Sequence, residues 1–341
     1  MRSLDVPLSV VPTSGGRTPS GPLRTTLFSM LGLTWHGAAQ PRILVRTHTA
    51  AGWTGWRAVP LLTDLPDSTV EGRPGLRATQ PWWVGPSDGV DVRVTGSVRD
   101  LELALIDPGQ TMGNATTQAR RTMSKPNKHK PKAAPRPRIK SRNAWGANEK
   151  WRDAKPRLNH TIKQVHIHHT ATGNRYSRRD VPALLRGIYR YHTHNLGWSD
   201  IGYNFLVDRF GRIWQGRAGG VGRPVRGAHT LGFNETSTGV SVLGTFTNKA
   251  PRRKVLTAIV RLAAWRLDHY KRRPAGRVKV RSQGSDKYAP GDRVRLPVID
   301  GHRDTNDTEC PGERLYAKLQ SVRKRAQVRA DRYDPPRNHH R

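Results

Sequence analysis

The chain has 341 residues, with 60 lysines and arginines against 25 aspartates and glutamates, so its formal net charge at pH 7 is +35. This length is sufficient for two domains. The single cysteine excludes an intrachain disulfide, and no apolar run reaches the roughly 18 residues of a transmembrane helix. The charge indicates a polyanionic neighbour, such as nucleic acid, an anionic membrane or a phosphate-rich cell wall, or else an arginine-rich composition without a binding role.

Residues 1–22 are rich in Gly, Ser, Pro and Thr, which predicts a disordered N-terminal tail. This tail has neither a long apolar segment nor a small-residue cleavage site, so no secretory signal is recognisable. Residues 23–109 contain segments typical of short strands, among them ILVRTHT, VDVRVTG and LELALID, with turn signals between them. We therefore expect a small all-β domain. Two tryptophan pairs in it are either core residues or a platform for stacking sugars: Trp53 with Trp56, and Trp82 with Trp83.

Residues 110–140 include the run RRTMSKPNKHKPKAAPRPRIK, which has almost no large apolar residue. Such a segment buries no core, so we expect an extended linker stiffened by proline and by charge repulsion. The linker is either a solvated spacer or a means of holding the chain against an anionic surface. A basic tail is also expected at the other end of the chain, over residues 329–341.

Residues 141–328 alternate strand and helix signals, which predicts an α/β domain with a mixed sheet. QVHIHHT and GVSVLGTF are expected strands, and YNFLVDRFGRIWQG is an expected hairpin. One helix is expected to begin after Asp180 as N-cap, with Pro182 in its first turn, and to end at Gly197. Two further helices follow, the second after Pro311, and RVKVRSQGSDKYAPGDRVRLP predicts an inserted β-hairpin before it.

The only cysteine, Cys310, follows His302 closely, and a cluster of three histidines lies far upstream: His166, His168 and His169. One thiolate and two imidazoles would form a three-ligand zinc site, which leaves the fourth tetrahedral position open for water and so indicates catalysis. The spacing alone also allows a buried structural cysteine and ordinary core histidines, which are more common than a metal site. On a strand, alternation places His166 and His168 on one face and His169 on the other.

Several longer motifs decide between these interpretations. The stretches HHTATGN, GWSDIGYNFLVDRFGRIWQGR, GAHTLGFN, GVSVLGTF and GHRDTNDTECPG occur in this order along the chain. Their order and spacing resemble the zinc N-acetylmuramoyl-L-alanine amidases of the peptidoglycan recognition protein family, from about residue 142 to about residue 326. The resemblance implies the α/β fold of that family. It also implies hydrolysis of the lactyl amide bond between N-acetylmuramic acid and L-alanine in peptidoglycan.

The resemblance also implies a zinc cofactor and a set of ligands. The first ligand of the family matches His168, the second matches His302 in GHRDT, and the third matches Cys310 in ECPG. His166 shares a face of the strand with His168 and is the local alternative.

Further positions match residues that act beside the metal in the family. The catalytic tyrosine matches Tyr203, and Thr308 stands where phage-type members carry a lysine, so it offers a hydrogen bond but no positive charge. We expect three residues to contact substrate: His169, His229 and Asn234. Asp200 and Asp304 are candidates for orienting a ligand histidine.

Two other functions compete with the amidase. A recognition protein would bind muropeptide in the same groove with little turnover, but loss of the cysteine usually marks that class and Cys310 is present. A nucleic-acid-binding protein would need zinc-finger cysteine pairs or a basic recognition helix, and neither pattern occurs. We therefore expect a monomer that acts on peptidoglycan, contacts anionic wall polymers, has no specific nucleic-acid partner, and lies outside the cell or at its wall.

Overall fold

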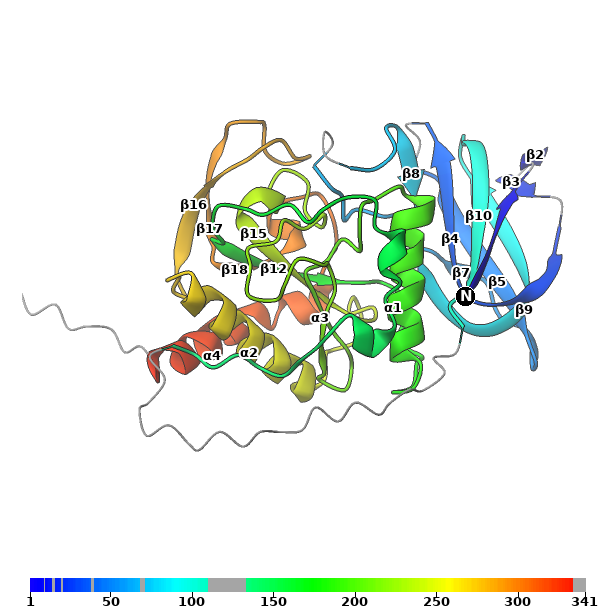
Figure 1. The fold of residues 1–341 in the computed structure, drawn as a ribbon. Coiled ribbons are helices and arrows are strands. Elements are labelled where there is room, and N and C mark those ends of the chain that lie inside the picture. Colours follow the sequence, from blue (N-terminus) through cyan, green and yellow to red (C-terminus); the bar gives the residue numbers. More distant parts are fainter. Residues whose placement is uncertain are drawn as a thin grey trace, which may run out of the picture.

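The computed structural model describes residues 1–8, 10–13, 16–19, 21–37, 40–67, 71–109 and 133–333. An N-terminal β domain lies beside a larger α/β domain, and helix α1 (Val181–Arg190) runs between them (Figure 1). The expected linker falls largely outside the described residues, as does the end of the expected C-terminal tail. No described helix combines the length and the apolar character needed to cross a bilayer.

The N-terminal domain is one ten-stranded sheet whose pairings are all antiparallel. The main order is β1-β10-β4-β9-β3-β2, with β5 on β9. Its core is a cluster of buried aliphatic and aromatic side chains that includes Trp35 and Leu103. The strands are β1 (Arg2–Pro7), β2 (Val10–Thr13), β3 (Gly16–Pro19), β4 (Leu23–His36), β5 (Arg42–Thr49), β6 (Gly52–Trp53), β7 (Arg57–Ala58), β8 (Leu76–Ala78), β9 (Trp82–Thr95) and β10 (Arg99–Asp107).

The start of the chain differs from the expectation of a disordered tail over residues 1–22. Arg2–Pro7 forms β1, which pairs with β10 in a register that sets Leu4 opposite Leu105. Leu8, just after the strand, is buried. The composition of the segment did not reveal this, because the partner of β1 lies far along the sequence.

The α/β domain contains a six-stranded mixed sheet in the order β11-β14-β13-β15-β12-β18. Strand β12 pairs in parallel with both β15 and β18, and β13 and β14 form the expected antiparallel hairpin. The inserted hairpin β16–β17 is also present. The strands are β11 (Ile139–Lys140), β12 (Gln164–His169), β13 (Phe205–Val207), β14 (Ile213–Gln215), β15 (Ser237–Val242), β16 (Arg277–Arg281), β17 (Arg293–Pro297) and β18 (Ile299–Gly301).

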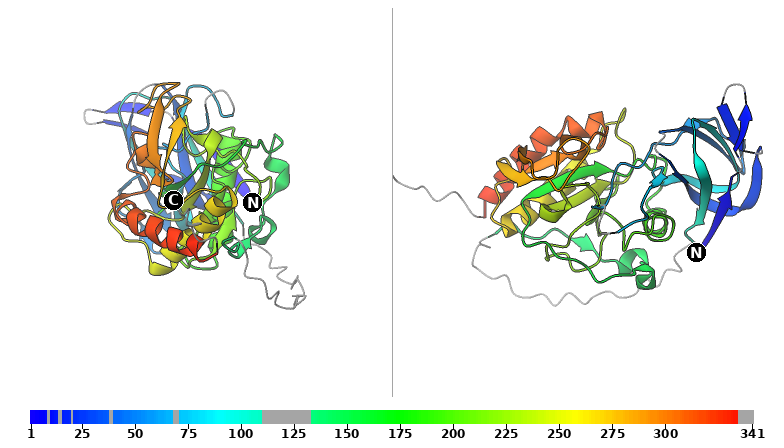
Figure 2. Two further views of the ribbon diagram at one scale, coloured as in Figure 1. Left: turned by 90° about the vertical axis from the view of Figure 1, so that its left-hand side faces the viewer. Right: turned by 90° about the horizontal axis from the view of Figure 1, so that it is seen from above.

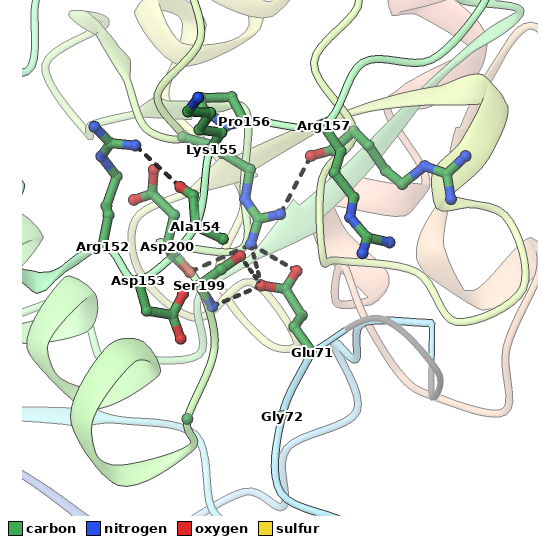
Figure 3. A pocket seen from close by; sticks show the side chains of 13 residues that line it. Glu71, Gly72, Arg152, Asp153, Ala154, Lys155, Pro156, Arg157, Ser199 and Asp200 are labelled. Carbon is green, nitrogen blue, oxygen red and sulfur yellow. Dashed lines mark hydrogen bonds and ion pairs between the residues drawn. The ribbon is translucent and has the colours of Figure 1, made fainter.

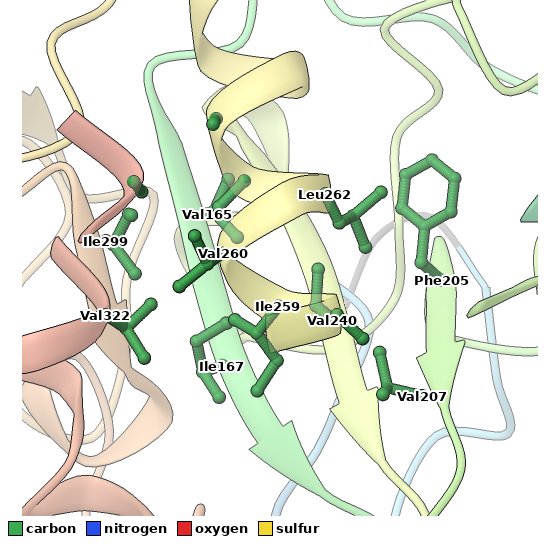
Figure 4. Close-up of a cluster of buried hydrophobic side chains, with 14 of the residues drawn as sticks. Val165, Ile167, Phe205, Val207, Val240, Ile259, Val260, Leu262, Ile299 and Val322 are labelled. Atoms are coloured by element: carbon green, nitrogen blue, oxygen red, sulfur yellow. The ribbon is translucent and has the colours of Figure 1, made fainter. Parts of the chain in front are cut away.

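Helices cover the two faces of this sheet differently. On one face, α2 (Arg253–His269) and α4 (Leu319–Asp331) bury an apolar layer that joins Ile167 and Val240 of the sheet to Ile259 and Val322 (Figure 4). The other face carries α1. The remaining helical segments are α3 (Glu313–Tyr316), the short turns η1 (Asn143–Trp145), η2 (Glu149–Trp151), η4 (Asn234–Thr236) and η5 (His302–Asp304), and a π-helical turn, η3 (Tyr191–Asn195).

Helix α1 begins after Asp180 with Pro182 in its first turn, as expected, but Asp180 makes no side-chain cap. The regular helix ends at Arg190 and a π-helical turn continues it, whereas the sequence predicted an end at Gly197. In this turn the Tyr191 hydroxyl donates to the backbone carbonyl of Leu33 in the β domain. Tertiary packing against the neighbouring domain therefore alters the end of the helix.

The contact between the two domains is apolar and close. Met30 and Ile106 of the β domain belong to the same buried cluster as Leu184 and other side chains of α1. A Cβ added at Gly187 of α1 would come within 2.7 Å of the Met30 sulfur. Because the helix presents no side chain there, the β4 strand packs directly against its backbone. The right-hand view of Figure 2 shows the two domains side by side.

Candidate metal centre and active site

Four buried side chains gather at one end of the six-stranded sheet: Asp64, His168, His302 and Cys310. Their ligand atoms all lie within 4.8 Å of one another. Strands β12 and β18 are parallel neighbours with Ile167 opposite Gly301, so His168 and His302 lie at the same end of the two strands. The loop before α3 brings Cys310 to this end. Asp64 comes from the β domain.

The shortest distances in this cluster involve the carboxylate. Asp64 Oδ1 lies 2.6 Å from His168 Nδ1 and 3.0 Å from His302 Nδ1. Cys310 Sγ lies 3.7 Å from His168 Nδ1. All four residues are almost fully shielded from solvent. Neighbouring ligand atoms in a tetrahedral zinc site are about 3.3–3.8 Å apart, given metal–ligand bonds of about 2.0–2.3 Å. The distance of 3.7 Å between Cys310 and His168 lies in this range, whereas the two distances to Asp64 are shorter.

Three further observations test whether the residues suit a cation. Both ring nitrogens of His302 are buried without a hydrogen-bond partner, the approach of Asp64 being a charge contact. Burial raises the pKa of the Cys310 thiol well above its usual range, and the Asp64 carboxylate raises it further. A thiolate at this position therefore requires a positive partner. Burial also lowers the pKa of His168 to about 4, which keeps the imidazole neutral and able to ligate. The set fits zinc.

The three residues expected as zinc ligands are thus brought together, and the alternative His166 is not. His166 lies on the same face of β12, but its Nδ1 faces Asp300 Oδ1 at 2.6 Å, and both side chains are fully buried. Among the described residues, Cys310 and His302 group with His168 and Asp64, and His166 and Asp300 do not belong to that group.

Asp64 is the member of the cluster that sequence reasoning missed. Its Oδ2 accepts hydrogen bonds from Gln80 Nε2 and from the Tyr203 hydroxyl, both at 2.9 Å. Burial raises its pKa, but the close approach of the His168 and His302 rings outweighs this effect and holds the pKa well below its usual range. The carboxylate is therefore ionised. Nothing in the surrounding run VPLLTDLPDST indicates a ligand, because the contact arises only from the packing of two domains.

Tyr203 lies just before β13 and beside His168, with 5.7 Å between the ring centroids. Burial, and then the Asp64 carboxylate, raise the pKa of its hydroxyl well above the usual range, so it remains a hydrogen-bond donor at neutral pH. Thr308 lies nearby, where its Oγ1 accepts a hydrogen bond from the Cys310 backbone at 3.1 Å and lies 2.9 Å from the Thr63 hydroxyl.

The three expected substrate contacts occupy different places. His229 is fully buried, and its Nδ1 lies 3.1 Å from His168 Nε2. Gly239 packs so closely on the His229 ring that any side chain there would overlap it. Asn234 holds the backbone amide of His229 through its Oδ1 at 2.9 Å. His169 lies on the opposite face of β12, where its Nδ1 accepts a hydrogen bond from the Phe246 backbone at 3.2 Å.

The expectation that Asp200 and Asp304 orient a ligand histidine is wrong. Asp200 forms a buried ion pair with Arg142, and Asp304 accepts a hydrogen bond from the Tyr316 hydroxyl. The partner of the outer nitrogen of His168 is a second histidine, His229, instead of a carboxylate.

A second acidic residue of the β domain reaches into the α/β domain. Glu71 pairs with Arg217 at 2.8 Å and accepts a hydrogen bond from the Ser199 backbone at 2.7 Å. Figure 3 shows Glu71 reaching Ser199 at the wall of a pocket of about 350 Å³. Like Asp64, it is buried by residues of the other domain, with 5% of its side chain exposed.

Comparison with known proteins gives two family matches. Residues 158–313 match the family model described as N-acetylmuramoyl-L-alanine amidase. Residues 3–137 match the model described as Rv3811 N-terminal galactose-binding domain-like. The expected fold class is therefore confirmed: an α/β amidase-type domain preceded by a β domain.

Similar proteins share the α/β half of the chain. Peptidoglycan-recognition protein SC2 of Drosophila melanogaster is 30% identical over 183 residues, which cover 54% of this chain and 85% of the relative. Peptidoglycan recognition protein 1 of Mus musculus is 30% identical over 166 residues, or 48% of this chain and 78% of the relative.

Among solved structures, wild-type Drosophila PGRP-LB is 29% identical, with 54% of this chain and 93% of that chain covered and a TM-score of 0.43. His168, Tyr203, His302 and Cys310 lie in residues 158–313, which the amidase family model matches. The chain belongs to the peptidoglycan recognition protein and type 2 amidase family.

Proposed function

We propose that this protein is a zinc-dependent N-acetylmuramoyl-L-alanine amidase, which hydrolyses the lactyl amide bond between N-acetylmuramic acid and L-alanine in peptidoglycan. The observation that carries the proposal is the buried set of His168, His302 and Cys310 with the Tyr203 hydroxyl beside it. Membership of the family supports it, because the matching family model is described as this amidase.

In this proposal, His168, His302 and Cys310 hold the metal. Bound zinc supplies a Lewis acid that polarises the scissile carbonyl and lowers the pKa of water. His229 is a positioning residue, since its contact with His168 Nε2 fixes the ring of that ligand. Asn234 fixes His229 in turn through the backbone.

Tyr203 is the proposed catalytic hydrogen-bond donor. A preorganised donor stabilises an oxygen that becomes negative during amide hydrolysis. The present acceptor of the Tyr203 hydroxyl is an anionic oxygen of Asp64, which supports this role. Thr308, beside the Cys310 backbone, is proposed as a weaker donor.

The proposed substrate contacts are Thr308 and Asn234. Thr308 is partly exposed, whereas Asn234 is fully buried and its side-chain amide donates to the β domain in this conformation. The rings of His169 and His229 are held by a backbone group and by His168, and they act as positioning residues. The net charge of +35 favours a partner with phosphates and carboxylates, such as the anionic polymers of a cell wall.

The second candidate is a recognition protein that binds muropeptide with little turnover. The names of the relatives favour binding, and Cys310 at a ligand position favours hydrolysis. Mass spectrometry of purified peptidoglycan after incubation with the protein separates the two. The amidase releases stem peptides with a free L-alanine amino group, and Cys310→Ser should not. If the wild type releases no such peptides, recognition is the function that remains.

A further inference from the structure

One segment of the β domain contacts four of the residues that the proposed function places at the reaction: His168, His302, Tyr203 and Thr308. We call residues 61–67 the Asp64 segment. Asp64 reaches His168 and His302, as well as the Tyr203 hydroxyl. The Thr63 hydroxyl lies 2.9 Å from that of Thr308.

The same segment also binds Asn234. The Asn234 side-chain amide donates to Asp67 Oδ1 at 3.1 Å and to the Leu65 carbonyl at 3.3 Å. A peptide carbonyl and a carboxylate are also the groups that a peptidoglycan stem peptide presents. The segment therefore places the same kinds of polar group in the proposed groove as a stem peptide would, but it has no muramoyl amide bond that could be cleaved.

The position of Asp64 is fixed from both domains. Gln80 of the β domain donates to Oδ2, and both side chains are almost fully buried. A buried carboxylate without compensating partners is strongly destabilised. Here two histidines of the metal group and one tyrosine supply those partners. The apolar contact of β4 with α1 and the Glu71–Arg217 ion pair hold the domains in this arrangement.

We infer that the β domain closes the metal site of its own amidase domain: Asp64 is a fourth protein ligand for zinc, and the Asp64 segment occupies the substrate groove, so that the chain is latent in this conformation. The inference rests on the proposed function and adds its regulation.

The chemistry of zinc sites explains why this arrangement prevents turnover. Catalytic sites have three protein ligands and an open position, whereas four-ligand sites are closed. A thiolate and a carboxylate together also cancel the double positive charge of the ion, which removes the net positive charge that polarises a carbonyl. Asp64 therefore removes both the open position and the charge.

Withdrawal of the segment does not require the domains to unpack. The direct contacts of the segment with Thr308 and Asn234 are polar, whereas Leu62 and Leu65 pack at the margin of the apolar cluster between the domains. A cavity of about 450 Å³ lies beside the segment, lined by Leu61, Leu65, Trp198 and Leu231 among others. The segment has room to move into this space while Met30 stays packed on α1.

The test uses the full chain loaded with cobalt(II), and azide as a small anionic probe of an open metal position. Azide should leave the visible spectrum of the wild type unchanged and should shift that of Asp64→Ala. The zinc affinity of Asp64→Ala, measured by competition with a chromophoric chelator, should fall at least about tenfold. On a soluble muropeptide, Asp64→Ala should be at least about tenfold more active than wild type.

Two further variants make the test secure. Asp64→Asn keeps the shape of the side chain and should also admit azide, which guards against misfolding of the alanine variant. Asp5→Ala removes a contact with Asn195 that crosses the domain interface away from the metal, and it should behave as wild type. An equal azide response in wild type and Asp64→Ala would overturn the inference.

The outcomes also separate this inference from the proposed function. If wild type already hydrolyses muropeptide as fast as both Asp64 variants, latency is refuted and the amidase stands. If azide reaches only the Asp64 variants but none of the proteins hydrolyses peptidoglycan, closure of the metal site stands and the amidase is refuted.

Discussion

Two histidines on the same face of strand β12 each meet an aspartate at the same distance, yet they lie in different chemical settings. His166 and Asp300 are 2.6 Å apart, as are His168 and Asp64. The first pair comes from one domain and has no thiol beside it. His168 and Asp64 come from different domains, and His302 and Cys310 lie beside them. A buried histidine–aspartate contact is thus no indication of a metal site by itself, and the convergence of further ligands distinguishes the two pairs.

The largest expected effect comes from removing the Cys310 thiol, which lies beside His168 and Asp64. Cys310→Ser should retain little zinc and lose essentially all amidase activity, because a hydroxyl stays protonated where a thiolate would ligate. Elemental analysis of the purified chain and muropeptide hydrolysis measure the two losses. Full zinc content in this variant would contradict the assigned ligand set.

A smaller effect is expected from removing the Tyr203 hydroxyl, which donates a hydrogen bond to Asp64. Tyr203→Phe should lower kcat about 100-fold, which is typical for loss of one preorganised donor. Its zinc content should be unchanged, since the hydroxyl is not a ligand. The measurement is best made in an Asp64→Asn background, where the same hydroxyl is freed from the carboxylate. Loss of zinc together with activity would show that Tyr203 supports the metal site instead of the reaction.

The motifs that predicted the ligands are local, and this explains what the sequence could and could not reveal. His168, His302 and Cys310 each lie in a recognisable run of residues, and parallel pairing of β12 with β18 brings two of them together. Asp64 lies in an unremarkable loop of another domain. Only the packing of that domain on α1 places its carboxylate at the site.

The same reasoning covers the elements of the fold. Alternating and helical patterns predicted the hairpin β13–β14, the inserted hairpin β16–β17 and helix α2. Strand β1 was missed because its partner β10 is distant in sequence. Local patterns thus predict elements, and contacts between distant segments decide the rest.

An intermediate effect is expected at the outer nitrogen of the ligand histidine. His229→Ala removes the group that lies 3.1 Å from His168 Nε2. Loss of such an outer partner typically weakens metal affinity about 10–100-fold. Chelator competition measures this directly, with His269→Ala, at the end of α2, as a matched control on a histidine remote from the site. Equal affinities in the two variants would remove the positioning role of His229.

The smallest effect on the metal is expected from replacing His166, which the sequence left as the alternative to His168. His166→Ala should leave zinc content and activity near those of wild type, while His168→Ala should lose both.

His166→Ala should nevertheless lower the stability of the fold, because among the described residues it leaves the buried Asp300 with Gln164 as its side-chain hydrogen-bond partner. Burial already raises the pKa of the Asp300 carboxyl, so loss of the histidine should destabilise the fold by about 1–3 kcal/mol in urea unfolding. Adding Asp300→Asn removes the uncompensated charge and should restore much of this stability. Zinc loss in His166→Ala as complete as in His168→Ala would mean that the two pairs had been assigned in the wrong order.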